Sequence, residues 1–286
     1  MKKIGLLILI ITLSLFISGC KQDNMENIEI IVTNYPNEYI TENIYGKHAT
    51  ISSIYPDGVN IDDYEITKKQ KKDYAFKDLF IYNGQVEKER KLAVELLDLN
   101  PELKIIDAAY VLESDYSGED LWLNPSSLLM MSNNVRMGLN EYITSSYLKK
   151  EVTDNYNELK IKLSELDADY RVAVEEADNN VILTTNPILK YLTTFGIDVL
   201  VISDNTNEKD LDIIRSKVIS GIVDHIYKFK DDKLSPTVEE FVKDYGLEVV
   251  DLNKTNNLTD EERDNNKNYL DIMQDNLNSL KLEMYQ

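Results

Sequence analysis

The chain contains few of the residues on which catalysis and transition-metal binding most often depend. Of its 286 residues, one is cysteine and two are histidine. A single cysteine excludes an intramolecular disulfide. The sequence also has no Gly-rich phosphate loop and no G-x-S-x-G motif, which would place a nucleophilic serine on a sharp turn. We therefore predict that the protein is not an enzyme. The enzymatic alternative that stays open uses Asp62 and Asp120 as a general acid and base.

Basic residues are scarce as well. The chain has 31 lysine and arginine residues against 51 aspartate and glutamate residues, which gives a formal net charge of −20. Such a surface repels the phosphates of nucleic acids, so we expect no nucleic-acid partner. It is also repelled by anionic lipid headgroups, so any membrane attachment must come from something other than a basic patch. The hydrophobic content of 43% is sufficient for one or two cores.

The N-terminal stretch "MKKIGLLILIITLSLFISGC" indicates export. Lys2 and Lys3 precede an apolar run over residues 4–17. This run is shorter than the roughly 20 residues that span a bilayer, and it is typical of a secretory signal peptide. Two small residues before Cys20 form a typical bacterial lipoprotein cleavage box. We predict that residues 1–19 are removed and that Cys20 carries the lipid, which places the protein on the extracytoplasmic face of the cell membrane. An ordinary signal peptide with a chance cysteine is the alternative.

Strand-like apolar runs alternate with helical stretches on either side of a long helical segment. The expected strands cover 28–33, 49–55, 78–84 and 104–108 before that segment, and 180–185, 198–203, 225–229 and 247–252 after it. Such alternation indicates parallel sheets with helices on their faces. We predict an α/β fold with two α/β lobes joined by one long spanning helix. The expected divisions are a tether over 20–27, an N-terminal lobe over 28–125, a linking helix over 126–172 and a C-terminal lobe over 173–286.

The linking segment has a clear start. Asn124 is a suitable N-cap, and Pro125 stands at the first helical position. Apolar residues then recur at steps of three and four. One helix over residues 126–170 would extend about 65 Å, farther than a single small domain. This length predicts a rigid spine between the two lobes. The register slips near Ser145, which leaves two abutting helices as the alternative.

Several stretches together resemble one family, the substrate-binding lipoproteins of ABC-type zinc and manganese importers, also called metal-binding adhesin lipoproteins. The matching pieces include "YPDGVNIDDYEIT" (55–67), "DLWLNP" (120–125), "LTTNPILKYLTTFGI" (183–197) and "LTDEERDNNKNYLDIMQDNLNSLK" (258–281). The resemblance covers nearly the whole chain in order. It implies a monomer that holds a metal ion between two α/β lobes, with an ABC permease and its ATPase as partners.

The resemblance also suggests metal ligands. Two positions where the family usually carries histidine hold Asp62 and Asp120 in this chain, and a third, where it carries histidine or an acid, holds Asn186. The fourth, acidic ligand falls at Asp231 when counted back from the following Ser-Pro, or at Phe229 when counted forward from the preceding strand. The two histidines of the chain, His48 and His225, match no ligand position and are expected to be structural.

Replacing imidazoles by oxygen ligands changes the expected metal. Imidazole suits Zn²⁺, whereas carboxylate and carbonyl oxygens suit Mn²⁺, Ca²⁺ or Mg²⁺. Three clustered carboxylates would raise one another's pKa, and a dication would relieve that repulsion. We expect a divalent metal as transported ligand, zinc or manganese, with the oxygen-rich set favouring manganese. The alternative is a degenerate family member that binds a non-metal ligand or acts as an adhesion module.

Overall fold

The computed structural model describes residues 25–112 and 120–285. The predicted signal peptide and the lipidation site Cys20 lie outside the described residues. Among the residues described, no helix combines the length and the apolar character needed to cross a membrane.

The N-terminal lobe is built on a four-stranded parallel sheet with the strand order β2-β1-β3-β4. Its strands are β1 (Ile28–Val32), β2 (Ala49–Ser53), β3 (Leu79–Tyr82) and β4 (Lys104–Asp107). Helices α2 (Tyr35–Tyr45), α3 (Lys68–Ala75) and α4 (Glu87–Leu99) connect them, with a short 3-10 turn η1 (Gly46–His48) before β2. The central strands β1 and β3 are almost wholly buried, as expected for a sheet covered on both faces.

The C-terminal lobe repeats this arrangement. Its four parallel strands follow the order β6-β5-β7-β8. They are β5 (Val181–Thr184), β6 (Asp198–Val201), β7 (His225–Phe229) and β8 (Glu248–Leu252), connected by the 3-10 helix η3 (Pro187–Phe195) and by α7 (Glu208–Ile219) and α8 (Pro236–Tyr245). The predicted fold of two parallel-sheet α/β lobes is confirmed in both halves of the chain.

The linking segment over 126–172 is two abutting helices, the alternative that the slip in register near Ser145 left open. A turn, η2 (Leu121–Leu123), leads into α5 (Pro125–Tyr142), and α6 (Ser146–Glu175) follows as a separate helix packed against it. Asn124 caps α5 as expected. Ile143 then adopts an extended conformation, and the side chain of Ser145 accepts a hydrogen bond from Leu148 N, which starts α6. The helix therefore ends within a run of β-branched and serine residues, which favour caps over helix interiors.

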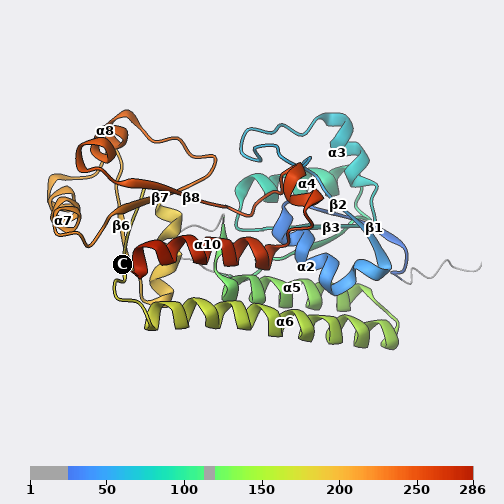
Figure 1. Ribbon diagram of the computed structural model, residues 1–286. Coiled ribbons are helices and arrows are strands. Elements are labelled where there is room, and N and C mark those ends of the chain that lie inside the picture. The colour runs from blue at the N-terminus through green and yellow to red at the C-terminus, as the bar shows by residue number, and fades with distance from the viewer. Residues whose placement is uncertain (1–24, 113–119, 286) are drawn as a thin grey trace, which may run out of the picture.

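The spanning role falls to α6 alone. Its 30 residues extend about 45 Å and pass beneath both lobes, with α5 alongside (Figure 1). The C-terminal segment divides into α9 (Asp260–Asp264) and α10 (Tyr269–Met284), and α10 lies across the two lobes above α6 (Figure 1). A capping box of Thr259 and Glu262 begins α9.

One apolar core runs through both lobes. It joins Ile30 of β1 to Leu163 of α6, Leu192 of η3 and Leu277 of α10, all of which are buried. Each sheet has a separate, smaller core on its other face. Since interiors are close-packed and resist deformation, this shared core holds the two lobes in a fixed relative position.

Candidate functional site

The predicted site residues all follow strands at their carboxyl ends. In the first lobe Asp62 lies in the loop after β2 and Asp120 in the connection after β4. In the second lobe Asn186 follows β5 and Asp231 follows β7. Because the strands of each sheet are parallel, these ends share one edge, which is where open α/β sheets bind their ligands.

The structure adds a residue that the sequence analysis did not single out. Lys254 follows β8 in the second lobe, and its Nζ lies 3.3 Å from Oδ2 of Asp120 and 3.8 Å from Oδ2 of Asp62. The side chain of Asp120 is 4% exposed and that of Asp62 is 75% exposed. Burial by itself lowers the pKa of Lys254, but the charges of Asp120 and Asp62 outweigh it and raise that pKa above its ordinary value. Lys254 is therefore a firmly protonated ammonium.

The backbone around Lys254 is fixed by side chains. The indole N–H of Trp122, which is buried, donates to the carbonyl oxygen of Lys254 at 2.9 Å. The Tyr269 hydroxyl in turn donates to the carbonyl oxygen of Trp122. Next to Lys254, Asn253 Oδ1 accepts from Thr255 N at 2.8 Å. These bonds fix the backbone of the segment, and the Lys254 side chain is held by its ion pairs with Asp120 and Asp62.

The loop that carries Asp62 is held by its own polar groups. Asn60 Oδ1 accepts from Asp62 N at 2.9 Å, and Asn60 Nδ2 donates to the carboxylate of Asp63 at 3.0 Å. Gly58 at the start of the loop has a positive φ of 70°, a conformation that glycine adopts without strain. The two neighbouring acids thus differ in partner, since Asp63 is bound within the loop and Asp62 pairs with Lys254.

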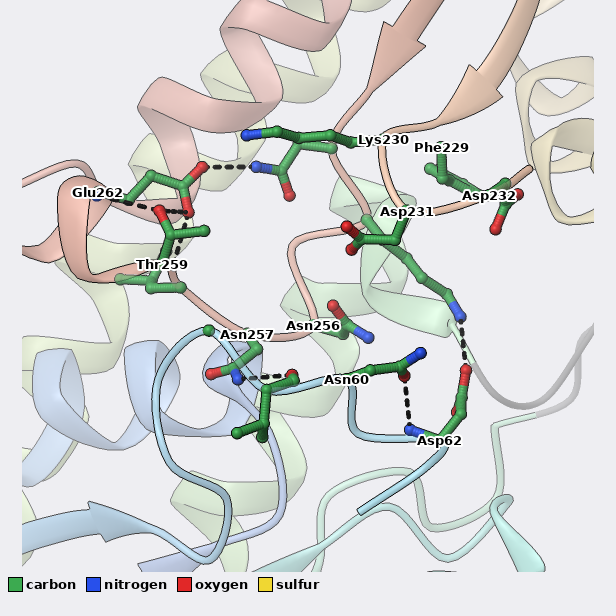
Figure 2. Close-up of a pocket in the computed structure, with 15 residues that line it drawn as sticks. Asn60, Asp62, Phe229, Lys230, Asp231, Asp232, Asn256, Asn257, Thr259 and Glu262 are labelled. Carbon is green, nitrogen blue, oxygen red and sulfur yellow. Dashed lines mark hydrogen bonds and ion pairs between the residues drawn. The ribbon is translucent and has the colours of Figure 1, made fainter. Parts of the chain in front are cut away.

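Asp231 and Asp62 line one cavity between the lobes, of about 140 Å³, to which Lys254 and Lys230 also contribute. Figure 2 shows Asp231 and Asp62 on different segments of the wall, with a dashed line joining Asp62 to the lysine ammonium. Asn186 contacts Asp232, the neighbour of Asp231, and its Nδ2 donates to Asp232 Oδ2 at 2.8 Å. The Asn186 oxygen accepts from Ile188 N and caps η3.

A second cavity, of about 180 Å³, adjoins the first through Asp62, Lys254 and Asn256, which line both. Asp120 and Trp122 also line it. So does Asn34, the buried N-cap of α2. The Asn34 side-chain oxygen accepts from Asn37 N, and its Nδ2 has no hydrogen-bond partner in the described part of the chain. We refer to the two cavities together as the cleft.

The expected convergence of three carboxylates on one point is not found. Among the described residues, no group of three histidine, cysteine, aspartate or glutamate side chains is placed to hold a metal ion. Asp62 and Asp120 meet at the ammonium of Lys254, while Asp231 lies on another part of the cleft wall. The repulsion between the first two carboxylates is thus relieved by a lysine.

Both histidines pair with acids away from the cleft. His225 Nδ1 lies 2.5 Å from Oε2 of Glu283, whose side chain is fully buried. His48 lies 3.3 Å from Glu151 of α6. These contacts hold strand β7 against α10, and the turn η1 before β2 against α6, so both histidines have structural roles.

The sequence analysis missed Lys254, Asn34 and Asn256. The signal that could have found them is position, because each is polar and follows the carboxyl end of a strand, β1 for Asn34 and β8 for the other two. Residue type gave no signal. Lysine and asparagine after a strand are ordinary components of solvated loops.

The curated relatives of this chain are named as zinc-binding or zinc-uptake proteins. It is 22% identical over 310 residues to the zinc-binding lipoprotein AdcA of Streptococcus pneumoniae, an alignment covering 98% of this chain and 61% of that protein. It is also 22% identical to the high-affinity zinc uptake system protein ZnuA of Bacillus subtilis, across 92% of this chain and 89% of that protein. The chain thus spans about 61% of the length of the pneumococcal relative.

A solved structure matches the fold. The zinc-bound ZnuA-like domain of AdcA from Streptococcus pneumoniae superposes with a TM-score of 0.74 at 23% identity, covering 91% of this chain and all of that domain. The family model described as zinc-uptake complex component A, periplasmic, matches residues 30–282. Because that match takes in almost all of the chain outside the predicted signal peptide and tether, the protein belongs to the ZnuA family of zinc-uptake complex components.

Proposed function

We propose that the chain is the solute-binding component of an ABC-type metal uptake system and that it captures a divalent cation in the cleft. One observation carries the proposal. Two carboxylates from separate loops of the first lobe, Asp62 and Asp120, converge on a single positively charged atom, Nζ of Lys254. The cleft is therefore already a site for a cation, which in this structure is the ammonium of Lys254. Family membership supports transport in place of catalysis.

Asp62 and Asp120 are the proposed principal ligands. A metal bound by both would take the place of the ammonium, at about 2.0–2.2 Å from their oxygens. We propose Asp231 as a third ligand because it lines the same cavity as Asp62. We propose Asn186 as the fourth because its amide donates to Asp232, which lines that cavity.

The proposed cargo is zinc or manganese. The curated relatives are named for zinc. In this chain the four proposed ligands offer only oxygen donors, which suit Mn²⁺ better than they suit Zn²⁺. Both ions therefore belong in any binding test, because a given site generally has a higher affinity for Zn²⁺ than for Mn²⁺ even where its donors suit manganese.

Lipid attachment and delivery complete the proposal. A lipid on Cys20 would hold the protein at the extracytoplasmic face of the membrane, where a permease and its ATPase would receive the ion. The N-terminal sequence and the name of the pneumococcal lipoprotein support the anchor. The name of the Bacillus relative, an uptake system protein, supports the transporter partner.

Thermal unfolding with added metal tests the cation site. A ligand that binds only the folded state at 100 times its dissociation constant raises the unfolding free energy by about 2.7 kcal/mol. We expect Mn²⁺ and Zn²⁺ to raise Tm, and Asp120→Asn to abolish most of the rise. Asp63→Asn is the matched control, because it removes a neighbouring carboxylate that is bound within its own loop. An unchanged Tm with both metals, or equal effects of the two variants, would contradict the proposal.

A second candidate is a small carboxylate-bearing molecule. The second cavity presents two donors that suit an anionic oxygen, the ammonium of Lys254 and the Nδ2 of Asn34, which has no hydrogen-bond partner among the residues that the structure describes. Buried donors without partners cost about 1–3 kcal/mol, so a ligand oxygen there would be favoured. A thermal-shift screen with mono- and dicarboxylates, repeated with Asn34→Ala, separates this candidate from the metal. It fails if no carboxylate raises Tm.

A further inference from the structure

We propose that Lys254 is a tethered cation that occupies the metal position, so that a metal binds only when the lysine ammonium leaves. This inference rests on the proposed cation site and concerns what controls its affinity and selectivity. The ammonium lies 3.3 Å from Asp120 and 3.8 Å from Asp62, each time measured to Oδ2. It thus lies against both carboxylates that are proposed to bind the metal.

The ammonium and a metal exclude one another. A metal shared by Asp62 and Asp120 would sit within about 2.0–2.2 Å of oxygens that now face Nζ. Both cations would then lie within a few ångströms of each other in a partly buried site, where repulsion is much stronger than in water. The lysine must therefore move as the metal enters.

The geometry allows that movement. The Lys254 side chain is 23% exposed and lines both cavities of the cleft, so it borders open space on two sides. Its backbone is held by Trp122. Because the side chain is short and its backbone is fixed, the ammonium stays near the carboxylates at an effective concentration in the millimolar range or higher. A free cation must compete with this concentration.

This arrangement sets the kind of ion that binds. A monovalent cation gains about the same Coulomb energy from Asp62 and Asp120 as the ammonium that it would displace, whereas a dication gains about twice as much. We infer that sodium and potassium fail to displace Lys254 and that divalent ions succeed at reduced affinity. The lysine thus acts as a selectivity residue.

Isothermal titration with Mn²⁺ and Zn²⁺ tests the inference in three proteins: wild type, Lys254→Met and Lys230→Met. Methionine keeps the length of the chain without its charge. Lys230 lines the same cavity (Figure 2) and forms no ion pair within the part of the chain that the structure describes, so it controls for the loss of one nearby charge. We expect Lys254→Met to bind at least ~10-fold more tightly than wild type, and Lys230→Met to bind like wild type.

The outcomes separate the inference from the function on which it rests. If wild type and Lys254→Met bind metal equally well, or if Lys230→Met matches the gain of Lys254→Met, Lys254 is not a competing occupant and the inference is wrong. If no protein binds either metal, the proposed cation site itself is wrong.

Removing Lys254 leaves Asp120 buried without that partner, so the variant has to be checked for folding by circular dichroism. A second measurement, made on the wild-type protein, does not depend on the folding of that variant. After ¹³C-methylation of the lysines, with the Lys254 signal assigned from Lys254→Arg, saturating Zn²⁺ should shift the Lys254 resonance toward those of exposed lysines. An unmoved resonance at saturation would overturn the inference.

Discussion

The indole N–H of Trp122 donates to the carbonyl oxygen of Lys254 at 2.9 Å, which ties the connection after β4 in the first lobe to the segment after β8 in the second. The bond spans 132 positions of the sequence and lies beside the ion pair of Lys254 with Asp120. Both contacts cross the cleft from the first lobe to the second. The two lobes are thus held together by the chain's own groups at the place where the cargo is proposed to bind.

Trp122 provides a direct optical probe of this site, because it is the single tryptophan of the chain and it lines the second cavity with Asp120 and Lys254. We predict that saturation with Mn²⁺ quenches its fluorescence and that Asp120→Asn removes the quenching at the same metal concentration. A metal that raises Tm while leaving the emission unchanged would bind elsewhere, which would contradict the placement of the site.

Arg263 of α9 clamps the first lobe. Its guanidinium binds both oxygens of Glu38 at 2.6 and 2.9 Å and both oxygens of Asp57 at 2.9 and 3.0 Å. The Glu38 side chain is 7% exposed, so Arg263→Ala leaves a buried charge without this partner. We predict a loss of roughly 2–4 kcal/mol in unfolding free energy, measured by urea denaturation.

The matched control for this clamp is Arg215→Ala. Arg215 pairs with Asp212 and Glu208 on the surface of α7, where ion pairs contribute little. The urea denaturation midpoint of the Arg215→Ala variant should stay at the wild-type value. Equal midpoints for the two arginine variants would show that Arg263 is not a clamp.

Glu89 should make stability depend on pH. Burial raises the pKa of this carboxyl to about 7, even though the Thr33 hydroxyl and Asn83 N–H donate to it. Since the folded state holds the proton more tightly than the unfolded chain, unfolding free energy falls as pH rises from about 4.5 to 7. At 1.36 kcal/mol per unit of pKa, the unfolding free energy falls by roughly 3 kcal/mol in total over this change in pH.

Glu89→Gln isolates this contribution, because the amide keeps an acceptor oxygen and does not ionise. We predict that the loss of stability between pH 5 and pH 8, measured by urea denaturation, is smaller in the variant by a few kcal/mol. Parallel pH profiles for wild type and variant would contradict the assignment.

Gly138 of α5 is required by close packing. An added Cβ would lie 2.7 Å from Cγ1 of Ile106 in β4 and within 2.9 Å of two further carbons of that buried side chain. Overpacking costs about 1–3 kcal/mol, which exceeds the gain in helix propensity of up to about 1 kcal/mol. Gly138→Ala should therefore lower Tm. Gly46→Ala is the control, because its Cβ would meet only Glu42 Cβ at 3.8 Å, and it should leave Tm unchanged or slightly higher.

Most of the fold could be predicted from the sequence because its signals are local. Each buried strand is a short apolar run bounded by polar residues, as in "IEIIV" of β1, and helix starts such as Asn124 and Thr259 carry their own caps. The break between α5 and α6 was harder to place. Apolar residues recur at helical spacing on both sides of Ser145, and only the slip in register there indicated the two abutting helices that the structure shows.

The candidate site could be predicted only in part, because its central contact is non-local. The resemblance identified Asp62 and Asp120, but nothing in the sequence around Lys254 indicates that it reaches Asp120 in the other lobe. That meeting depends on how two sheets are set against each other by a shared core. A lysine is a solvated surface residue in most loops, and only tertiary structure shows that this one is a counter-ion.

The most direct test of the account is the position of the metal itself. Crystals of the wild-type protein grown with saturating Mn²⁺ should show an anomalous difference peak bound by Asp62 and Asp120, with the Lys254 side chain turned away. An ordered Lys254 still paired with both carboxylates, and no peak between them, would contradict the claim that this cleft captures a divalent cation.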